Sequence, residues 1–148
     1  PTRRSSDLNV ENRIYQITKD ELNSIKQQLN SKSNTWIAEI DGDNISTWQD
    51  YADEIERVFK FPANIIEMHV NGLSIDGYLD WITDLSWLNA NGYALIINNF
   101  DIFMSGDLRK KEIIIESFEK NVLPWWQSQV EQYQVGGKAK PFNVYVVD

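Results

Sequence analysis

The sequence predicts an α/β fold in which a small parallel β-sheet of three to four strands is connected by crossover helices. Short segments that are apolar, or that alternate between apolar and polar residues, recur along the chain as strands require. Longer segments with helical apolar spacing lie between them. Each connection between two expected strands is too long for a hairpin, which favours parallel pairing. The expected order of elements is β-α-β-α-α-β-α-α-β.

Four segments carry the strand pattern. They are rich in β-branched and aromatic residues, which suit a pleated and buried surface. The expected strands are 13–17 (RIYQI), 36–40 (WIAEI), 93–98 (YALIIN) and 142–147 (FNVYVV). Together with the apolar faces of the helices, they predict a core formed by Trp36, Ile40, Ile55, Phe59, Leu79, Ile82, Leu95, Ile97, Phe118, Val144 and Val146.

Two helices are expected on either side of the second strand. An apolar stripe with helical spacing predicts the first helix over 19–30. Ser46, with Gln49 three residues later, has the pattern of a capping box and predicts the start of the next helix. Pro62 is expected to end it, because proline cannot continue a helix.

Three further helical segments are expected in the second half of the chain. One follows Ser74, and another covers about 107–121. Pro124 is expected to begin a separate turn or helix, since proline is favoured at the first helical position.

The chain divides into three expected parts. Residues 1–8 (PTRRSSDL) look like the translation of a DNA sequencing adaptor, so we expect them to be non-native; the alternative is a genuine disordered basic tail. Residues 9–34 form an N-terminal βα extension, and 35–148 form the main domain.

The composition narrows the range of functions to be expected. Among 148 residues, 14 are basic and 22 acidic, which gives a formal net charge of −8. This charge disfavours direct binding to nucleic acid or to a membrane surface and favours a basic partner. The chain has no Cys and one His, so thiol chemistry, a Ser-His-Asp site and a two-His metal site are not expected within it. We expect a cytoplasmic protein without a cofactor.

The helix after Ser74 is acidic on one face. Residues 61–108 contain no Lys or Arg, while Asp76, Asp80 and Asp84 follow one another at intervals of four. At ~100° per residue these carboxylates lie together, opposite an apolar face. That face comprises Ile75, Tyr78, Leu79 and Ile82. Neighbouring like charges cost the helix about 0.2–0.5 kcal/mol per pair, which indicates a role other than stability.

The same region resembles the barstar family, whose members are intracellular inhibitors of barnase-type ribonucleases. The resemblance is carried by Phe61-Pro62, Gly72, Ser74, Asp76, Tyr78, Asp80 and the run 83–88 (TDLSWL). It covers 35–148, so a barstar-like domain is expected there. This chain departs from the family pattern by about six additional residues within 63–71, and by Ser74 where Asn is usual.

The resemblance implies a function and a site. The protein would inhibit a basic ribonuclease or nuclease toxin and would be a monomer when free. Asp80 matches the central inhibitory residue of the family and Asp76 a neighbouring contact. The full set of expected partner-binding residues is Asp80, Asp76, Thr83, Asp84, Gly72, Ser74 and Leu79. We expect Asp76 and Asp80 to be exposed above buried Tyr78, Leu79 and Ile82.

Two other functions remain open from the residues alone. The acidic helix could belong to an interaction module without a nuclease target, in which its charges are only solvated. Alternatively, Asp76 and Asp80 could act as an acid and base pair in an enzyme, although no substrate-binding motif accompanies them.

Overall fold

The computed structural model describes residues 11–62 and 72–148, and within them it confirms the predicted α/β fold. Its parallel sheet contains β2 (Ile14–Ile17), β3 (Thr35–Asp41), β4 (Gly92–Asn98) and β5 (Phe142–Val147). The strands lie in the order β2-β5-β4-β3. The N-terminal strand therefore extends the same sheet as the rest of the chain. Residues 1–8 and the additional residues within 63–71 lie outside the described part.

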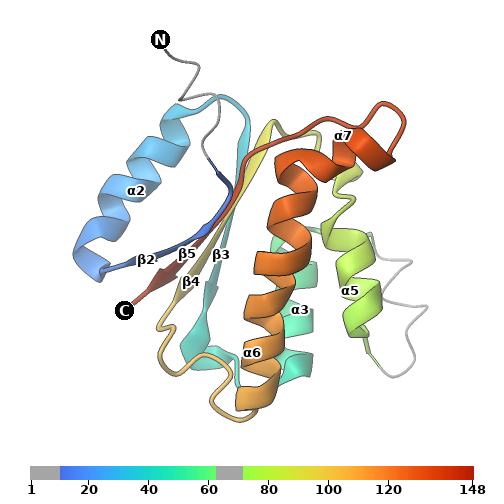
Figure 1. Ribbon diagram of the computed structural model, residues 1–148. Helices are drawn as coiled ribbons and strands as arrows, with labels where there is room; N and C mark the ends of the chain where they lie inside the picture. Colours follow the sequence, from blue (N-terminus) through green and yellow to red (C-terminus); the bar gives the residue numbers. More distant parts are fainter. Residues whose placement is uncertain (1–10, 63–71) are drawn as a thin grey trace.

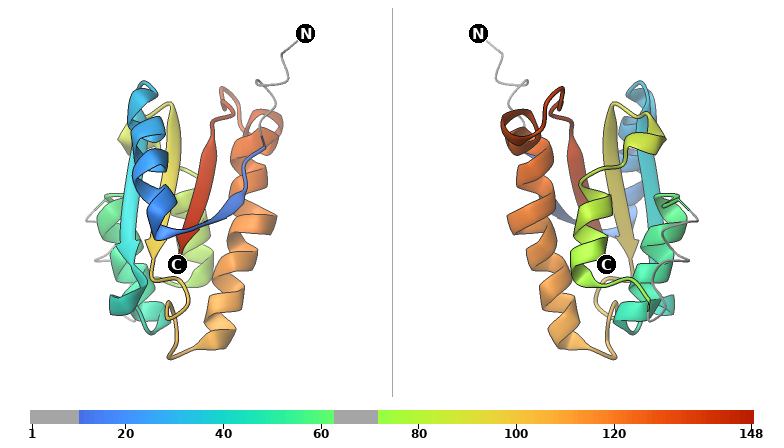
Figure 2. Two further views of the ribbon diagram at one scale, coloured as in Figure 1. Left: turned by 90° about the vertical axis from the view of Figure 1, so that its left-hand side faces the viewer. Right: turned by 90° about the vertical axis from the view of Figure 1, so that its right-hand side faces the viewer.

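Helices cover both faces of this sheet (Figures 1 and 2). α2 (Lys19–Ser31) packs on one face through a small apolar cluster. α3 (Trp48–Val58), α5 (Ile75–Ile82) and α6 (Leu108–Ser117) lie on the other face, over the main core. Because β4 is covered on both sides, every residue from Gly92 to Ile97 is buried. This explains its uninterrupted apolar sequence.

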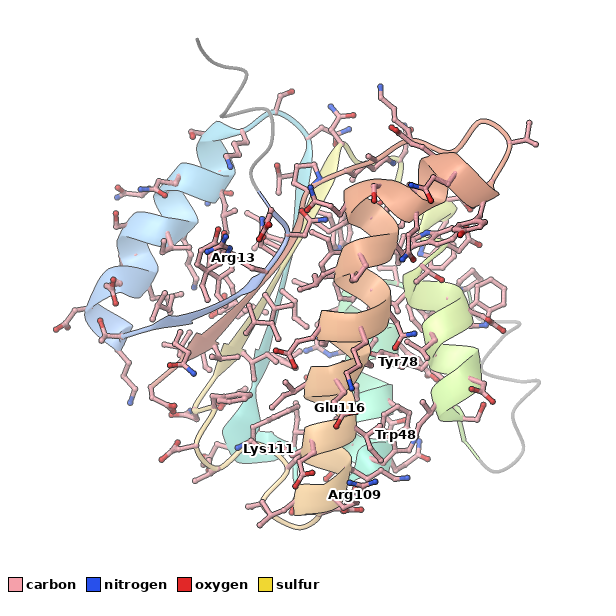
Figure 3. The ribbon with its side chains drawn as sticks, in the orientation of Figure 1. Arg13, Trp48, Tyr78, Arg109, Lys111 and Glu116 are labelled. Carbon is pink, nitrogen blue, oxygen red and sulfur yellow. The ribbon has the colours of Figure 1, made fainter. Side chains whose placement is uncertain are left out.

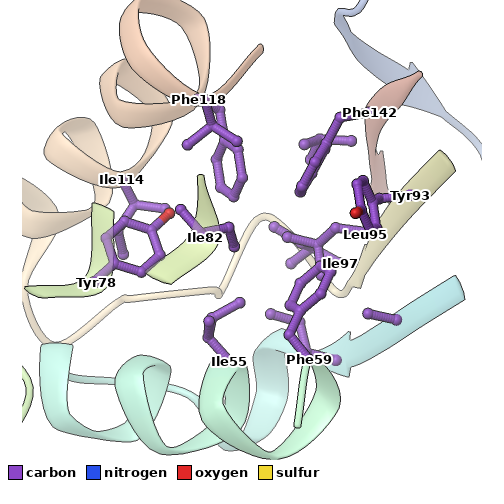
Figure 4. Close-up of a cluster of buried hydrophobic side chains, with 14 of the residues drawn as sticks. Ile55, Phe59, Tyr78, Ile82, Tyr93, Leu95, Ile97, Ile114, Phe118 and Phe142 are labelled. Atoms are coloured by element: carbon purple, nitrogen blue, oxygen red, sulfur yellow. The ribbon is translucent and has the colours of Figure 1, made fainter. Parts of the chain in front are cut away.

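The main core contains most of the predicted residues (Figure 4). Two of them, Trp36 and Leu79, are only half-buried, so the prediction was wrong for these positions. Trp36 is on the edge strand β3, and its indole N–H donates to the Val58 carbonyl at 2.9 Å. Leu79 lies at the margin of the buried stripe of α5, next to its exposed face.

The ends of α3 differ from the prediction. Its N-cap is Thr47 with Asp50, one residue after the expected pair, and the two residues form a reciprocal capping box. The helix ends at Val58, before Pro62, because Lys60 adopts a left-handed conformation with φ 54°. The Phe61 N–H then donates back to the Glu56 carbonyl at 2.9 Å, as in a Schellman-type helix end.

The last helix does not stop at Pro124. α6, two π-helical turns, η3 (Phe118–Val122) and η4 (Trp125–Gln129), and α7 (Val130–Tyr133) form one uninterrupted helical segment. In the first π turn the Leu123 N–H donates to the Phe118 carbonyl, five residues earlier. A π turn just before Pro124 accommodates the missing N–H and the bulk of the proline ring. The expected separate helix is therefore a continuation.

Candidate functional site

The candidate site is the exposed side of α5 and the residues at its two ends. Ser74 is the N-cap, and its hydroxyl accepts a hydrogen bond from the Gly77 N–H at 3.0 Å. Tyr78 and Ile82 are fully buried on the opposite side of the helix. Since these two residues are four apart, they fix one face of α5 against the core and direct the other face to solvent.

Tyr78 anchors α5 to both neighbouring helices (Figure 3). Its hydroxyl lies 2.8 Å from the Tyr51 hydroxyl on α3 and 3.2 Å from Ser117 Oγ on α6. Burial raises the pKa of Tyr78 to about 12, so the phenol is neutral at physiological pH. Trp48 adds an edge-to-face contact with the same ring at 5.5 Å. The position of α5 is therefore set by a satisfied hydroxyl chain and by aromatic packing.

Asp76 and Asp80 lie on the exposed side of α5, as expected. Within residues 11–62 and 72–148, neither carboxylate has a hydrogen bond or an ion pair. Asp76 is in the first turn, where the helix dipole favours a negative charge, but Asp80 is closer to the C-terminal end, where it does not. The arrangement leaves both carboxylates available to a cation from outside.

Asp84 does not continue this row of carboxylates, which corrects the expectation. α5 ends at Ile82 with Thr83 as its C-cap, so Asp84 is beyond the helix. Its carboxylate accepts a hydrogen bond from the Ser86 N–H at 3.3 Å. Burial raises the pKa of Tyr93 to about 12, and the negative charge of Asp84 adds to this shift. Lys140 Nζ lies 3.4 Å from the same Tyr93 hydroxyl, so the structure brings a distant cation to this end of α5.

The other expected site residues occupy the rim of the exposed face. The Thr83 hydroxyl donates to the Leu79 carbonyl at 2.6 Å, which leaves its oxygen free to accept. Leu79 is half-buried beside it, not buried as predicted. At the other end of the helix, Gly72 has φ 86° and lies against the Gln49 side chain, a position that only glycine occupies without strain. The indole of Trp48 donates to the Leu73 carbonyl at 2.7 Å and ties this segment to α3.

Trp81, which directly follows Asp80, was not among the site residues expected from the sequence. It is half-buried, and its ring lies 5.8 Å from that of Trp87. A tryptophan between the buried and the exposed side of a short helix has no distinctive sequence signal, because aromatic residues are more often part of the core.

Within the described part of the chain, no group of three or more His, Cys, Asp or Glu residues could hold a metal ion. His69 lies outside that part. No helix among the described residues is long and apolar enough to cross a membrane.

Comparison with known families finds a match over most of the chain. The family model described as Barstar (barnase inhibitor) matches residues 36–145, which include all of α3, α5 and the helical segment from α6 to α7. No curated protein matches the chain significantly. The matched region begins within β3, so β2 and α2 precede it.

Proposed function

The chain belongs to the barstar family, and we propose that it inhibits a barnase-type ribonuclease or toxin domain by covering the basic active site with α5. Members of this family are inhibitors and not enzymes. We further propose that the protein acts in the cytoplasm of the cell that makes the nuclease, as a monomeric immunity protein. The inhibitory surface would belong to the domain formed by 35–148.

The observation that carries this proposal is the pair of exposed carboxylates, Asp76 and Asp80, without partners among the described residues. A ribonuclease must hold a polyanionic substrate, so its active site presents Lys, Arg and His to phosphate oxygens. Carboxylates can occupy the same positions and exclude RNA. In this proposal Asp80 meets the centre of the cleft and Asp76 binds beside it.

The rigid support of α5 favours tight binding. Tyr78 and Ile82 are buried, and the hydroxyl of Tyr78 is held by Tyr51 and Ser117. A helix fixed in this way loses little conformational freedom on association, so less of the interaction free energy is spent on ordering.

Residues at the rim would complete the contact. The Thr83 oxygen can accept a hydrogen bond from the nuclease, and the Ser74 hydroxyl can donate one, since its oxygen already accepts from Gly77. Backbone near Gly72 and the half-buried side chain of Leu79 would add polar and apolar contacts respectively. Asp84 would bind at the edge of the surface, where its negative charge also helps to raise the pKa of Tyr93.

The overall charge suits a basic partner. With a formal net charge of −8, the protein attracts a cationic nuclease over distances comparable to the Debye length, about 8–10 Å at physiological salt. Such steering raises the association rate constant at low salt more than it changes the dissociation rate constant. We expect association to slow markedly between low and high ionic strength.

An inhibition assay tests the proposal. Purified protein is titrated into a barnase-type ribonuclease that cleaves a fluorogenic RNA, and the wild type is expected to abolish cleavage stoichiometrically. Asp80→Asn keeps the shape of the side chain but removes its charge, so the inhibition constant should rise at least about 30-fold. The matched control is Asp53→Asn on α3, an exposed carboxylate that Gln49 Nε2 contacts at 2.7 Å. Equal inhibition by wild type and Asp80→Asn would contradict the assignment.

A further inference from the structure

The indole N–H groups of the six tryptophans differ in a way that points to Trp81. Four of these groups donate to backbone carbonyls at 2.7–3.1 Å; they belong to Trp36, Trp48, Trp87 and Trp126. The fifth, on Trp125, is buried without an acceptor. The sixth, on Trp81, also has no acceptor among residues 11–62 and 72–148, but it is not buried. Trp81 is thus the tryptophan that offers a free donor at the surface.

Trp81 borders the acidic face of α5. Successive residues are ~100° apart around a helix, so Asp80 lies between Asp76 on one side and Trp81 on the other. The side chain of Trp81 is half-buried, which leaves part of it open to contact. A large aromatic side chain directly beside an exposed carboxylate is the composition of a protein-binding surface more than of a solvated one.

The ring of Trp81 rests on a fixed support. It packs against Trp87 at 5.8 Å, and Trp87 packs edge-to-face against Phe61, also at 5.8 Å. Trp87 itself cannot turn freely, because its N–H donates to the Phe59 carbonyl at 2.9 Å. The open donor of Trp81 is therefore held in place before any partner arrives.

We propose that Trp81 is part of the partner-binding surface and donates its indole N–H to an oxygen of the bound nuclease, next to the cation that meets Asp80. This inference rests on the proposed function. It adds a requirement on the partner: the basic side chain that binds Asp80 must be accompanied by a hydrogen-bond acceptor, such as a backbone carbonyl. A surface that carries only positive charge would leave the donor of Trp81 covered and unpaired, at a cost to affinity.

The substitution Trp81→Phe tests the role of the N–H. Phenylalanine keeps an aromatic ring against Trp87 but has no donor. Because the N–H has no acceptor among the described residues of the free protein, its loss should leave the denaturant midpoint unchanged. The Kd for a catalytically inactive barnase-type ribonuclease should rise at least about threefold. Tyr15→Phe is the control, since Tyr15 is a half-buried aromatic residue that stacks on Tyr145 on the opposite face of the sheet. It should leave the Kd unchanged.

A second measurement uses the wild-type protein and needs no folded variant. In ¹⁵N spectra, the indole N–H of Trp81 should exchange quickly with solvent in the free protein and should become protected in the complex. The four indole groups that donate to carbonyls should exchange slowly in both states. The Trp81 signal is the one that disappears in Trp81→Phe.

The outcomes separate this inference from the proposed function. If the wild type neither binds nor inhibits the ribonuclease, the proposed function fails. If the wild type binds, and Trp81→Phe binds equally well or the Trp81 indole exchanges as quickly in the complex as in the free protein, only the role of Trp81 is overturned. A Tyr15→Phe control that weakens binding as much as Trp81→Phe does would overturn it as well.

Discussion

α3 and α5 are two short helices on the same side of the sheet, and they differ in how they use their carboxylates. On α3, Asp50 closes the capping box with Thr47, Asp53 accepts from Gln49, and Glu54 pairs with Arg57 at 2.8 Å. On α5, Asp76 and Asp80 have no such partner within the described residues. Local hydrogen bonds account for these charges of α3. On α5 the helix dipole favours Asp76 alone, and no hydrogen bond or ion pair among the described residues accounts for Asp80.

The two helices are otherwise alike. Each begins at a hydroxyl N-cap, and each buries a tyrosine and an isoleucine completely, Tyr51 and Ile55 on α3 and Tyr78 and Ile82 on α5. The two tyrosines even share a hydrogen bond. α5 is shorter than α3 and lacks its capping box, but the buried sides match, so the two helices differ most on their exposed sides. This is the pattern expected when one of two similarly packed elements also binds a partner.

The largest expected effect is a loss of stability when the buried isoleucine of α3 or of α5 is truncated, and it tests whether the two helices pack alike. Ile55→Ala and Ile82→Ala each remove a fully buried side chain, and each should lower the free energy of unfolding by about 2–5 kcal/mol. Denaturant unfolding measures both losses, with Ile102→Ala as the control because Ile102 is 39% exposed. A loss below about 1 kcal/mol for Ile82→Ala would mean that α5 is not fixed as the structure indicates.

The next largest effect is the loss of stability when the N-cap side chain of either helix is removed. Thr47→Ala and Ser74→Ala remove side chains that accept from the Asp50 and Gly77 N–H groups respectively. Each should cost about 0.5–2 kcal/mol in the free energy of unfolding. Ser33→Ala, in an exposed turn, is the control and should be nearly neutral. If Ser74→Ala were equally neutral, the start of α5 would have to be held by contacts other than its cap.

Lowering the pH should destabilise the protein through two carboxyl groups of α3. The Ser46 N–H donates to Asp50 and lowers the pKa of that carboxyl, and the hydrogen bond from Arg57 lowers the pKa of Glu54. A carboxyl with a lowered pKa in the folded state stabilises the protein above the pKa of the unfolded chain, and this stabilisation is lost as the pH falls through the folded value. The free energy of unfolding should therefore decline as the pH is lowered below about 4.

The double variant Asp50→Asn/Glu54→Gln separates this contribution from the rest. Asn and Gln do not ionise, so no carboxylate is protonated at these two positions as the pH falls. In denaturant titrations over the same acidic interval, the free energy of unfolding of the variant should therefore fall less steeply than that of the wild type. Identical slopes for the two proteins would show that these carboxyls do not stabilise α3 through their charge.

The elements and the exposed position of Asp76 and Asp80 were predictable because they depend on local patterns. Alternation and apolar runs identified all four described strands, and the spacing of four between Asp76 and Asp80 placed them on one exposed face. Helix ends were less predictable, since Ser46-Gln49 and Thr47-Asp50 are adjacent candidates for a cap and only the folded backbone distinguishes them.

The remaining features depend on tertiary contacts. The sequence shows no cation near Asp84, but the fold brings Lys140 to the hydroxyl of Tyr93, whose pKa the negative charge of Asp84 helps to raise. Likewise, whether the indole of a tryptophan is free depends on which carbonyls surround it. The open donor of Trp81 could not be predicted from the sequence. Four other indole N–H groups donate to backbone carbonyls, and only the folded backbone shows that Trp81 has no such acceptor among the described residues.

The most direct test of the central claim compares Asp80→Ala on α5 with Asp53→Ala on α3. Both variants lose one exposed carboxylate from a helix, and both are measured for binding to a barnase-type ribonuclease and for denaturant unfolding. Asp80→Ala should weaken binding by at least ~2 kcal/mol through faster dissociation. Its stability should be unchanged or slightly higher, because the repulsion with Asp76 is removed. Asp53→Ala should bind within about 0.5 kcal/mol of the wild type. Equal binding by the two variants would contradict the claim that α5 carries the inhibitory charges.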